Sequence, residues 1–228
     1  MYRAMIRYFT FFSCLFLITG LAVDAQQDVV KNPEQFVFPD FSVGVVKLKN
    51  MEKIPLALNY NVVTGKMVFM QKNQIFDMIR YSNVDTVYIH ERKFVPFDNV
   101  FYEVLINESV SLFIQHKGEI TQPPRPAAYG GTSQLSSTTY ITNLRMGNDV
   151  YRLKNDESLE IDPVPVIWIR KDNTMYTVSN RRSLLKIFSD RKNEMKEFIN
   201  RNRINTENPG DLIRTVNFYN DLIQEKRP

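Results

Sequence analysis

Between residues 42 and 178 the chain alternates short apolar runs with turn residues, the pattern of β-strands joined by tight turns. Thr64-Gly65, Asn107-Glu108-Ser109 and Asp172-Asn173 each separate two runs closely enough to predict a hairpin. The runs are rich in β-branched and aromatic residues, which favour strands. The predicted strands cover residues 43–49, 56–62, 66–70, 84–90, 94–96, 100–106, 110–114, 139–144, 150–153, 166–169 and 175–178.

After residue 180 the apolar positions recur at the spacing of a helix. A short helical turn is predicted over 182–188, and Asp190 is placed to cap the helix that follows it. One face of that helix carries Met195, Phe198, Ile199 and Asn202.

A further helix begins at Asn208, where an asparagine cap precedes Pro209 in the first helical position. Its apolar stripe consists of Leu212, Val216, Tyr219 and Ile223. Because an isolated helix of this length is marginal in water, the stripe is expected to be buried against the sheet. The predicted fold class is therefore α+β, a mainly antiparallel β-sheet or barrel-like domain followed by a C-terminal helical pair.

The N-terminal residues have the three parts of a secretory signal peptide. Arg3 and Arg7 precede an apolar run over 8–18, and small side chains predict cleavage after Ala25. The run is shorter than the roughly 20 apolar residues of a membrane span, which favours cleavage over a retained anchor. The single cysteine, Cys14, lies inside the run, which argues against a lipoprotein signal and leaves the mature chain without disulfides.

The expected organisation is a cleaved signal over 1–25, a flexible leader over 26–41 and a single α+β domain over 42–228. Within that domain the β-rich part covers 42–178 and the helical part covers 181–226. The formal net charge of the whole chain is only +4, which gives no indication of nucleic-acid binding. No transmembrane span is expected after cleavage of the signal.

Several segments together resemble an uncharacterised family of exported Bacteroidota proteins with no assigned activity. They are Leu58-Asn59-Tyr60-Asn61, Val84-Asp85-Thr86-Val87-Tyr88-Ile89, Arg92-Lys93-Phe94-Val95-Pro96, Phe101-Tyr102-Glu103-Val104-Leu105 and Tyr129-Gly130-Gly131-Thr132-Ser133. The resemblance spans most of residues 56–200. It implies a location in the periplasm or on the extracellular side of a diderm bacterium, and it supplies no catalytic residues.

Residues that carry chemistry are sparse. His90 and His116 each end an apolar strand, where histidines often point to solvent, and no spacing typical of a metal site is present. We therefore expect no metal and no cofactor. Asp85 and Glu103 lie on strands predicted to be adjacent, where two facing carboxylates would permit glycosidase chemistry, although strand carboxylates more often face water or pair with lysine.

A long connection over 121–137 is rich in proline and glycine, and loops of this length are often functional or disordered. Tyr129, Gly130 and Gly131 are its candidate binding residues, and the simpler interpretation of the glycine pair is a loop with unusual backbone angles. We expect this loop to be the first site of cleavage by a protease.

The segment 181–203 holds eight Lys and Arg residues against three acids, a net charge of +5. Arg181, Arg182 and Lys186 are its candidate binding residues, for anionic lipid or polysaccharide. The alternative is an ordinary solvated helix face.

These observations favour an exported, non-enzymatic envelope or secreted protein with a binding or structural role. Its partner would be an envelope glycan, a lipid or another protein. The alternative is a hydrolase that acts on envelope polysaccharide or peptide.

Overall fold

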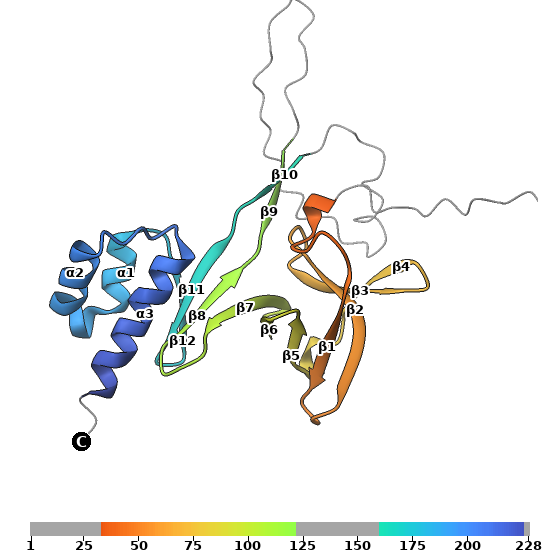
Figure 1. Cartoon of the computed structure of the whole chain (residues 1–228), viewed down its shortest axis with the longest axis horizontal. Coiled ribbons are helices and arrows are strands. Elements are labelled where there is room, and N and C mark those ends of the chain that lie inside the picture. Colours follow the sequence, from red (N-terminus) through yellow and green to blue (C-terminus); the bar gives the residue numbers. More distant parts are fainter. Residues whose placement is uncertain (1–32, 122–159, 226–228) are drawn as a thin grey trace, which may run out of the picture.

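The computed structural model describes residues 33–121 and 160–225, which form an open antiparallel sheet with helices against one end of it (Figure 1). Ten of the described strands make this sheet, in the order β12-β11-β8-β7-β6-β5-β1-β2-β3-β4. Their bounds are β1 Ser42–Leu48, β2 Lys53–Asn61, β3 Lys66–Gln71, β4 Gln74–Asp77, β5 Val84–Ile89, β6 Arg92–Phe97, β7 Val100–Ile106, β8 Ser111–Gln115, β11 Val166–Lys171 and β12 Thr174–Val178. The predicted α+β class is confirmed, with an open sheet in place of a barrel.

A separate ribbon of two strands, β9 Gly118–Thr121 and β10 Glu160–Pro163, continues from β8 and leads into β11. The sequence pattern did not indicate β4, β9 or β10, because each has only four residues and no clear alternation. The strands predicted over 139–144 and 150–153 lie outside the described residues.

Two-residue turns with left-handed backbone set the register of three hairpins. Lys72-Asn73, Asp98-Asn99 and Asp172-Asn173 all have positive φ at both positions, between 47° and 62°. Such turns match the twist of the strands they join. The sequence indicated only the last of the three, and the predicted hairpins at Thr64-Gly65 and at Asn107–Ser109 are also present.

Three helices follow the sheet: α1 Arg181–Ile187, α2 Lys192–Arg201 and α3 Pro209–Gln224. The Asn208 side chain accepts hydrogen bonds from the backbone of Gly210 and Asp211, as the sequence predicted for the start of α3. Asp190 does not cap α2, so that prediction is wrong. Its carboxylate instead binds the ammonium of Lys171 and accepts a 2.7 Å hydrogen bond from the Tyr219 hydroxyl.

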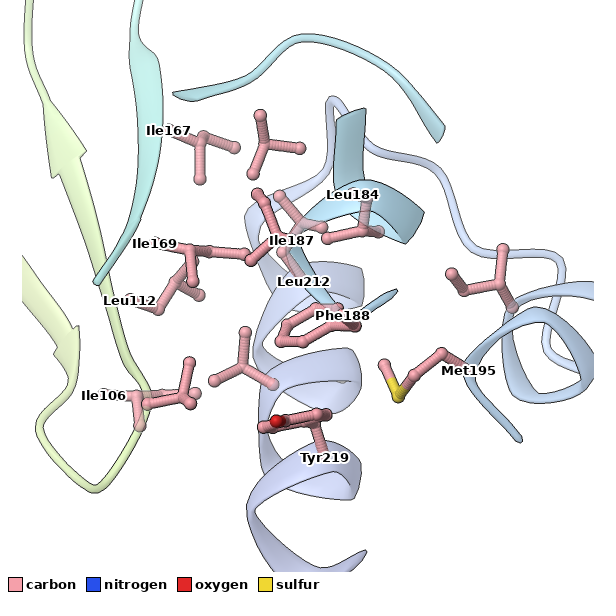
Figure 2. Close-up of a cluster of buried hydrophobic side chains, with 14 of the residues drawn as sticks. Ile106, Leu112, Ile167, Ile169, Leu184, Ile187, Phe188, Met195, Leu212 and Tyr219 are labelled. Carbon is pink, nitrogen blue, oxygen red and sulfur yellow. The ribbon is translucent and has the colours of Figure 1, made fainter. Parts of the chain in front are cut away.

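The helices cover one face of β7, β8 and β11 and enclose the helical core (Figure 2). Side chains of the strands and side chains of the helices point toward one another there, and Phe188 lies among the helices, between Leu212 and Met195 (Figure 2). The aromatic rings of Phe188 and Tyr219 lie 4.4 Å apart between centroids. The buried members of this core are Ile106, Val110, Leu112, Ile114, Ile167, Ile169, Val178, Leu184, Ile187, Phe188, Met195, Ile199, Leu212, Val216 and Tyr219.

A second core, the strand core, lies within the curved N-terminal part of the sheet. Its buried members are Phe38, Val46, Leu58, Tyr60, Val62, Met67, Met78, Val84, Val87, Ile89, Phe94, Phe101 and Ile161. The expected leader over 26–41 is therefore too long, since the chain packs on the domain from Pro33 onward and Phe38 is buried. The burial of Phe36 and Phe38 holds this segment on the domain, although Pro33 and Pro39 suggested a flexible one.

Two buried asparagine side chains hydrogen-bond to backbone that lies outside the strands. The Asn59 side chain accepts from the backbone N–H of Phe38 at 3.1 Å and donates to its carbonyl at 2.8 Å. Asn220 of α3 makes the same two bonds to Val110, at 2.9 and 3.0 Å. Each amide thus replaces the strand neighbour that the bound residue lacks. None of the helices in the described ranges is long and apolar enough to cross a membrane.

Leu212→Ala is expected to destabilise the whole domain, because Leu212 is fully buried between α3 and the sheet. Removing a buried leucine side chain costs about 2–5 kcal/mol, which corresponds to a fall in melting temperature of roughly 5–15 °C for a domain of this size. Thermal unfolding followed by circular dichroism measures it. Asn217→Ala, on the exposed face of the same helix, is the control. An unchanged melt for Leu212→Ala would mean that α3 is a free arm.

Candidate functional site

Arg92, Glu103 and His116 form a polar cluster, the seam cluster, where the two cores meet. Arg92 begins β6, Glu103 lies in β7 and His116 follows the end of β8. Across the sheet, Glu103 is opposite Phe94 of the strand core on one side and opposite Ile114 of the helical core on the other. The fold therefore places a carboxylate at the boundary between two apolar regions.

The three side chains bind one another closely. Arg92 donates from Nε to Oε1 of Glu103 and from Nη2 to Oε2, both at 2.6 Å. Nε2 of His116 lies 2.7 Å from Oε2 of Glu103 and 2.9 Å from Nη2 of Arg92. A two-pronged arginine–carboxylate contact of this kind fixes direction as well as distance.

Aromatic rings surround the cluster. The Arg92 guanidinium lies 4.9 Å from the ring centre of Phe38 and 5.5 Å from that of Phe94. The Tyr60 ring meets His116 edge to face at 5.7 Å and stacks on Phe94 at 5.8 Å. The faces of the Phe38 and Phe94 rings attract the guanidinium cation of Arg92.

Glu103 remains ionised despite its burial, with only 10% of its side chain exposed. Burial raises the pKa of Glu103, but the hydrogen bonds and charges of His116 and Arg92 outweigh it and lower the pKa to about 2. The carboxylate of Glu103 is thus an anion held by three nitrogen atoms, Nε and Nη2 of Arg92 and Nε2 of His116.

His116 has two neighbours that make opposite demands on one nitrogen. Arg92 is only a donor and ionised Glu103 is only an acceptor, so Nε2 satisfies one of them at a time. A proton on Nε2 directs the ring to Glu103, and this is the hydrogen bond that contributes to lowering the pKa of the carboxyl. The contact with Arg92 then results from sharing Oε2.

The arrangement leaves the acid and base of the cluster engaged with each other. Both oxygens of Glu103 accept from Arg92, and Oε2 also faces His116. A general base needs a lone pair within hydrogen-bond reach of a substrate proton.

Within residues 33–121 and 160–225, no group of three or more His, Cys, Asp or Glu side chains is arranged to hold a metal ion.

The predicted pairing of Asp85 with Glu103 is wrong, because β6 lies between β5 and β7. The exposed carboxylate of Asp85 instead pairs with Lys47 on β1 at 3.0 Å. Alternation identified the strands but not their order in the sheet, and the β5–β6 hairpin separates the two acids.

The two histidines differ in environment. His90 occupies the turn after β5, is exposed and has positive φ, as expected for a histidine at a strand end. The expectation that His116 points to solvent is wrong, because only 19% of its side chain is exposed. In the sequence, His116 follows a run of five residues that are all buried in the structure. This position alone does not show that His116 has a buried partner, because the partner comes from a neighbouring strand whose place in the sheet must be known.

The candidate binding residues Tyr129, Gly130 and Gly131 lie outside the described residues, as does the connection predicted over 121–137 except for Thr121, which ends β9. Arg181, Arg182 and Lys186 all lie on α1 and are exposed. Arg181 donates a hydrogen bond to the side chain of Asn200 on α2. The structure therefore brings α1 beside the C-terminal end of α2, and it does not bring these cations near the seam cluster.

Comparisons with models of protein families, with curated proteins and with solved structures give no match.

Glu103 should make stability depend on pH in the acid range. A carboxyl whose pKa falls from 4.5 to about 2 on folding adds stability that is fully present above pH 4.5 and lost as the pH falls through 2. The contribution is about 3 kcal/mol, since each unit of pKa is worth about 1.4 kcal/mol.

Urea unfolding of the protein and of Glu103→Gln between pH 7 and pH 2 tests this. The difference in unfolding free energy between the two proteins should be constant above about pH 5 and should shrink below it. Glu108→Gln, in the exposed β7–β8 turn, gives the cost of removing a surface carboxylate. A difference that stays the same down to pH 2 would show that the seam cluster does not hold Glu103 ionised.

Proposed function

We propose that the protein is an exported, non-enzymatic protein of a bacterial envelope, or one secreted from it, that acts by binding or in a structural role. Export to the periplasm or extracellular side is supported by the charged start, apolar run and small-residue site over 1–25. The absence of cysteine after residue 14 suits a bacterial envelope better than an animal extracellular space.

The observation that supports a non-enzymatic role is that the polar side chains of the seam cluster are bound to one another. Among the described residues Glu103 is the one buried carboxylate, and it contacts His116, so this pair is the candidate for acid–base chemistry. Their polar atoms bind one another, and the rings of Phe38, Phe94 and Tyr60 pack around them. A cluster of this kind fixes neighbouring strands, and it leaves partner recognition to the surface.

The competing hydrolase has less support in the geometry. Glycosidases use two carboxyl groups that flank the scissile bond, separated by roughly 5–10 Å across a space that admits the sugar. Glu103 faces Arg92 and His116, and Asp85 faces Lys47 on the far side of β6. The two acids considered for this role therefore have separate cationic partners.

The purified protein is expected to give no turnover on a panel of glycan, peptide and ester substrates, measured against a buffer blank and a commercial hydrolase. Turnover that co-purifies with the protein, and that a single carboxylate or serine substitution abolishes without changing the melting temperature, would favour the hydrolase.

Export is tested on the native protein by N-terminal mass spectrometry. The mature chain is expected to begin at Gln26 and to carry no lipid. An acylated Cys14 would instead identify a lipoprotein, and an intact Met1 would identify a retained anchor.

A further inference from the structure

The cations and most of the acids of residues 181–203 lie on different sides of the helices. At about 3.6 residues per turn, Lys192, Lys196 and Asn200 share one flank of α2. That flank is turned to α1, because Asn200 accepts a hydrogen bond from Arg181. The two adjacent helices carry five exposed cations, which we call the basic face: Arg181, Arg182 and Lys186 of α1 with Lys192 and Lys196 of α2.

Two of the three acids in residues 181–203 lie elsewhere. Glu194 shares the flank of α2 that carries Phe198, and this flank is turned to α3 because Phe198 stacks on Phe218 at 4.1 Å. Asp190 points to the sheet side, where Lys171 and Tyr219 bind it.

Each acid of the segment also has a cationic partner that is not part of the basic face. Asp190 pairs with Lys171, and Glu197 pairs with Arg201 one turn along α2. Glu194 lies 3.8 Å from Arg191. Within the described part of the chain, the five cations of the basic face therefore form no ion pair.

The stability of the fold does not account for this placement. Arg182 and Lys186 are four residues apart on α1, as are Lys192 and Lys196 on α2, and like charges at this spacing repel. Arg181, Arg182 and Lys192 also occupy the first turns of their helices, where the macrodipole disfavours cations. A bound anion would relieve both effects.

The surface around these charges indicates which kind of anion. Helices that lie on a membrane carry Trp, Phe or Leu on the side that enters the lipid. None of the large hydrophobic side chains exposed in the described ranges lies on α1, α2 or α3. A hydrated polyanion fits a surface of charge without apolar anchors better than a bilayer does.

We propose that the basic face is a binding site for an acidic polysaccharide, which it contacts through several arginine and lysine side chains at once. This inference rests on the proposed function, that the protein acts by binding. Recognition is electrostatic, so the affinity falls as ionic strength rises.

The test is affinity electrophoresis and titration calorimetry of the protein with polygalacturonate, with neutral dextran as the blank. Arg182→Gln combined with Lys186→Gln, and Lys192→Gln combined with Lys196→Gln, should each weaken binding about tenfold or more. Both double variants should melt at the same temperature as the unmodified protein or above it, since each removes a like-charge pair.

Lys49→Gln combined with Lys53→Gln is the matched control. It removes the same charge from exposed positions around the β1–β2 turn, which lies away from the helices (Figure 1). This control should bind as the unmodified protein does. If it weakens binding as much as the helix variants, net charge alone is responsible and the basic face is not a site.

Two other outcomes would overturn the inference. Tighter binding to phosphatidylglycerol vesicles than to polygalacturonate would assign the basic face to a membrane. Binding to neither polyanion nor vesicles would remove the site while leaving the proposed function to another surface. Hydrolysis of the polysaccharide would instead contradict the proposed function, so the two failures are distinguishable.

Discussion

Arg92, Glu103 and His116 lie where a single sheet passes from one hydrophobic core to the other. An ion cluster in such a place is weak evidence for stability, because desolvation offsets much of the attraction. Its contribution is geometric. The guanidinium fork fixes β6 against β7, and His116 fixes the end of β8 just beyond the irregularity between Val104 and Ile106. A slip of one residue would turn Glu103 to the wrong face and leave a charge unpaired.

Each core then has to hold a segment that the sheet alone would not hold. Phe38 contributes to the strand core from irregular chain, and Val110 contributes to the helical core from beside a turn. In both cases a fully buried asparagine supplies the donor and the acceptor that a strand neighbour would have supplied. A buried amide is costly unless it is fully bonded. These residues therefore confine the chain to one arrangement as much as they stabilise it.

Local pattern was sufficient for most of the elements and insufficient for the site. The buried stripe on α3 could be predicted from Leu212, Val216 and Tyr219, because their helical spacing is visible within one short segment of sequence. The seam cluster could not, because Arg92 and His116 are brought together by strand order. The same limit explains the error over Asp85 and Glu103. Asp190 was misassigned because a cap and a tertiary ion pair compete for one carboxylate, and sequence shows only the first.

The division between core and surface also explains why the basic face is tolerated. α1 and α2 gain their stability from Leu184, Met195 and Ile199, which are buried against the sheet and α3. Helices stabilised by packing do not depend on favourable charges in their first turns. Cations can therefore accumulate there at a small cost, provided that nearby acids are drawn to other partners. Lys171 and Arg201 do this for Asp190 and Glu197, so the five exposed cations of the basic face have no acid partner within the described residues.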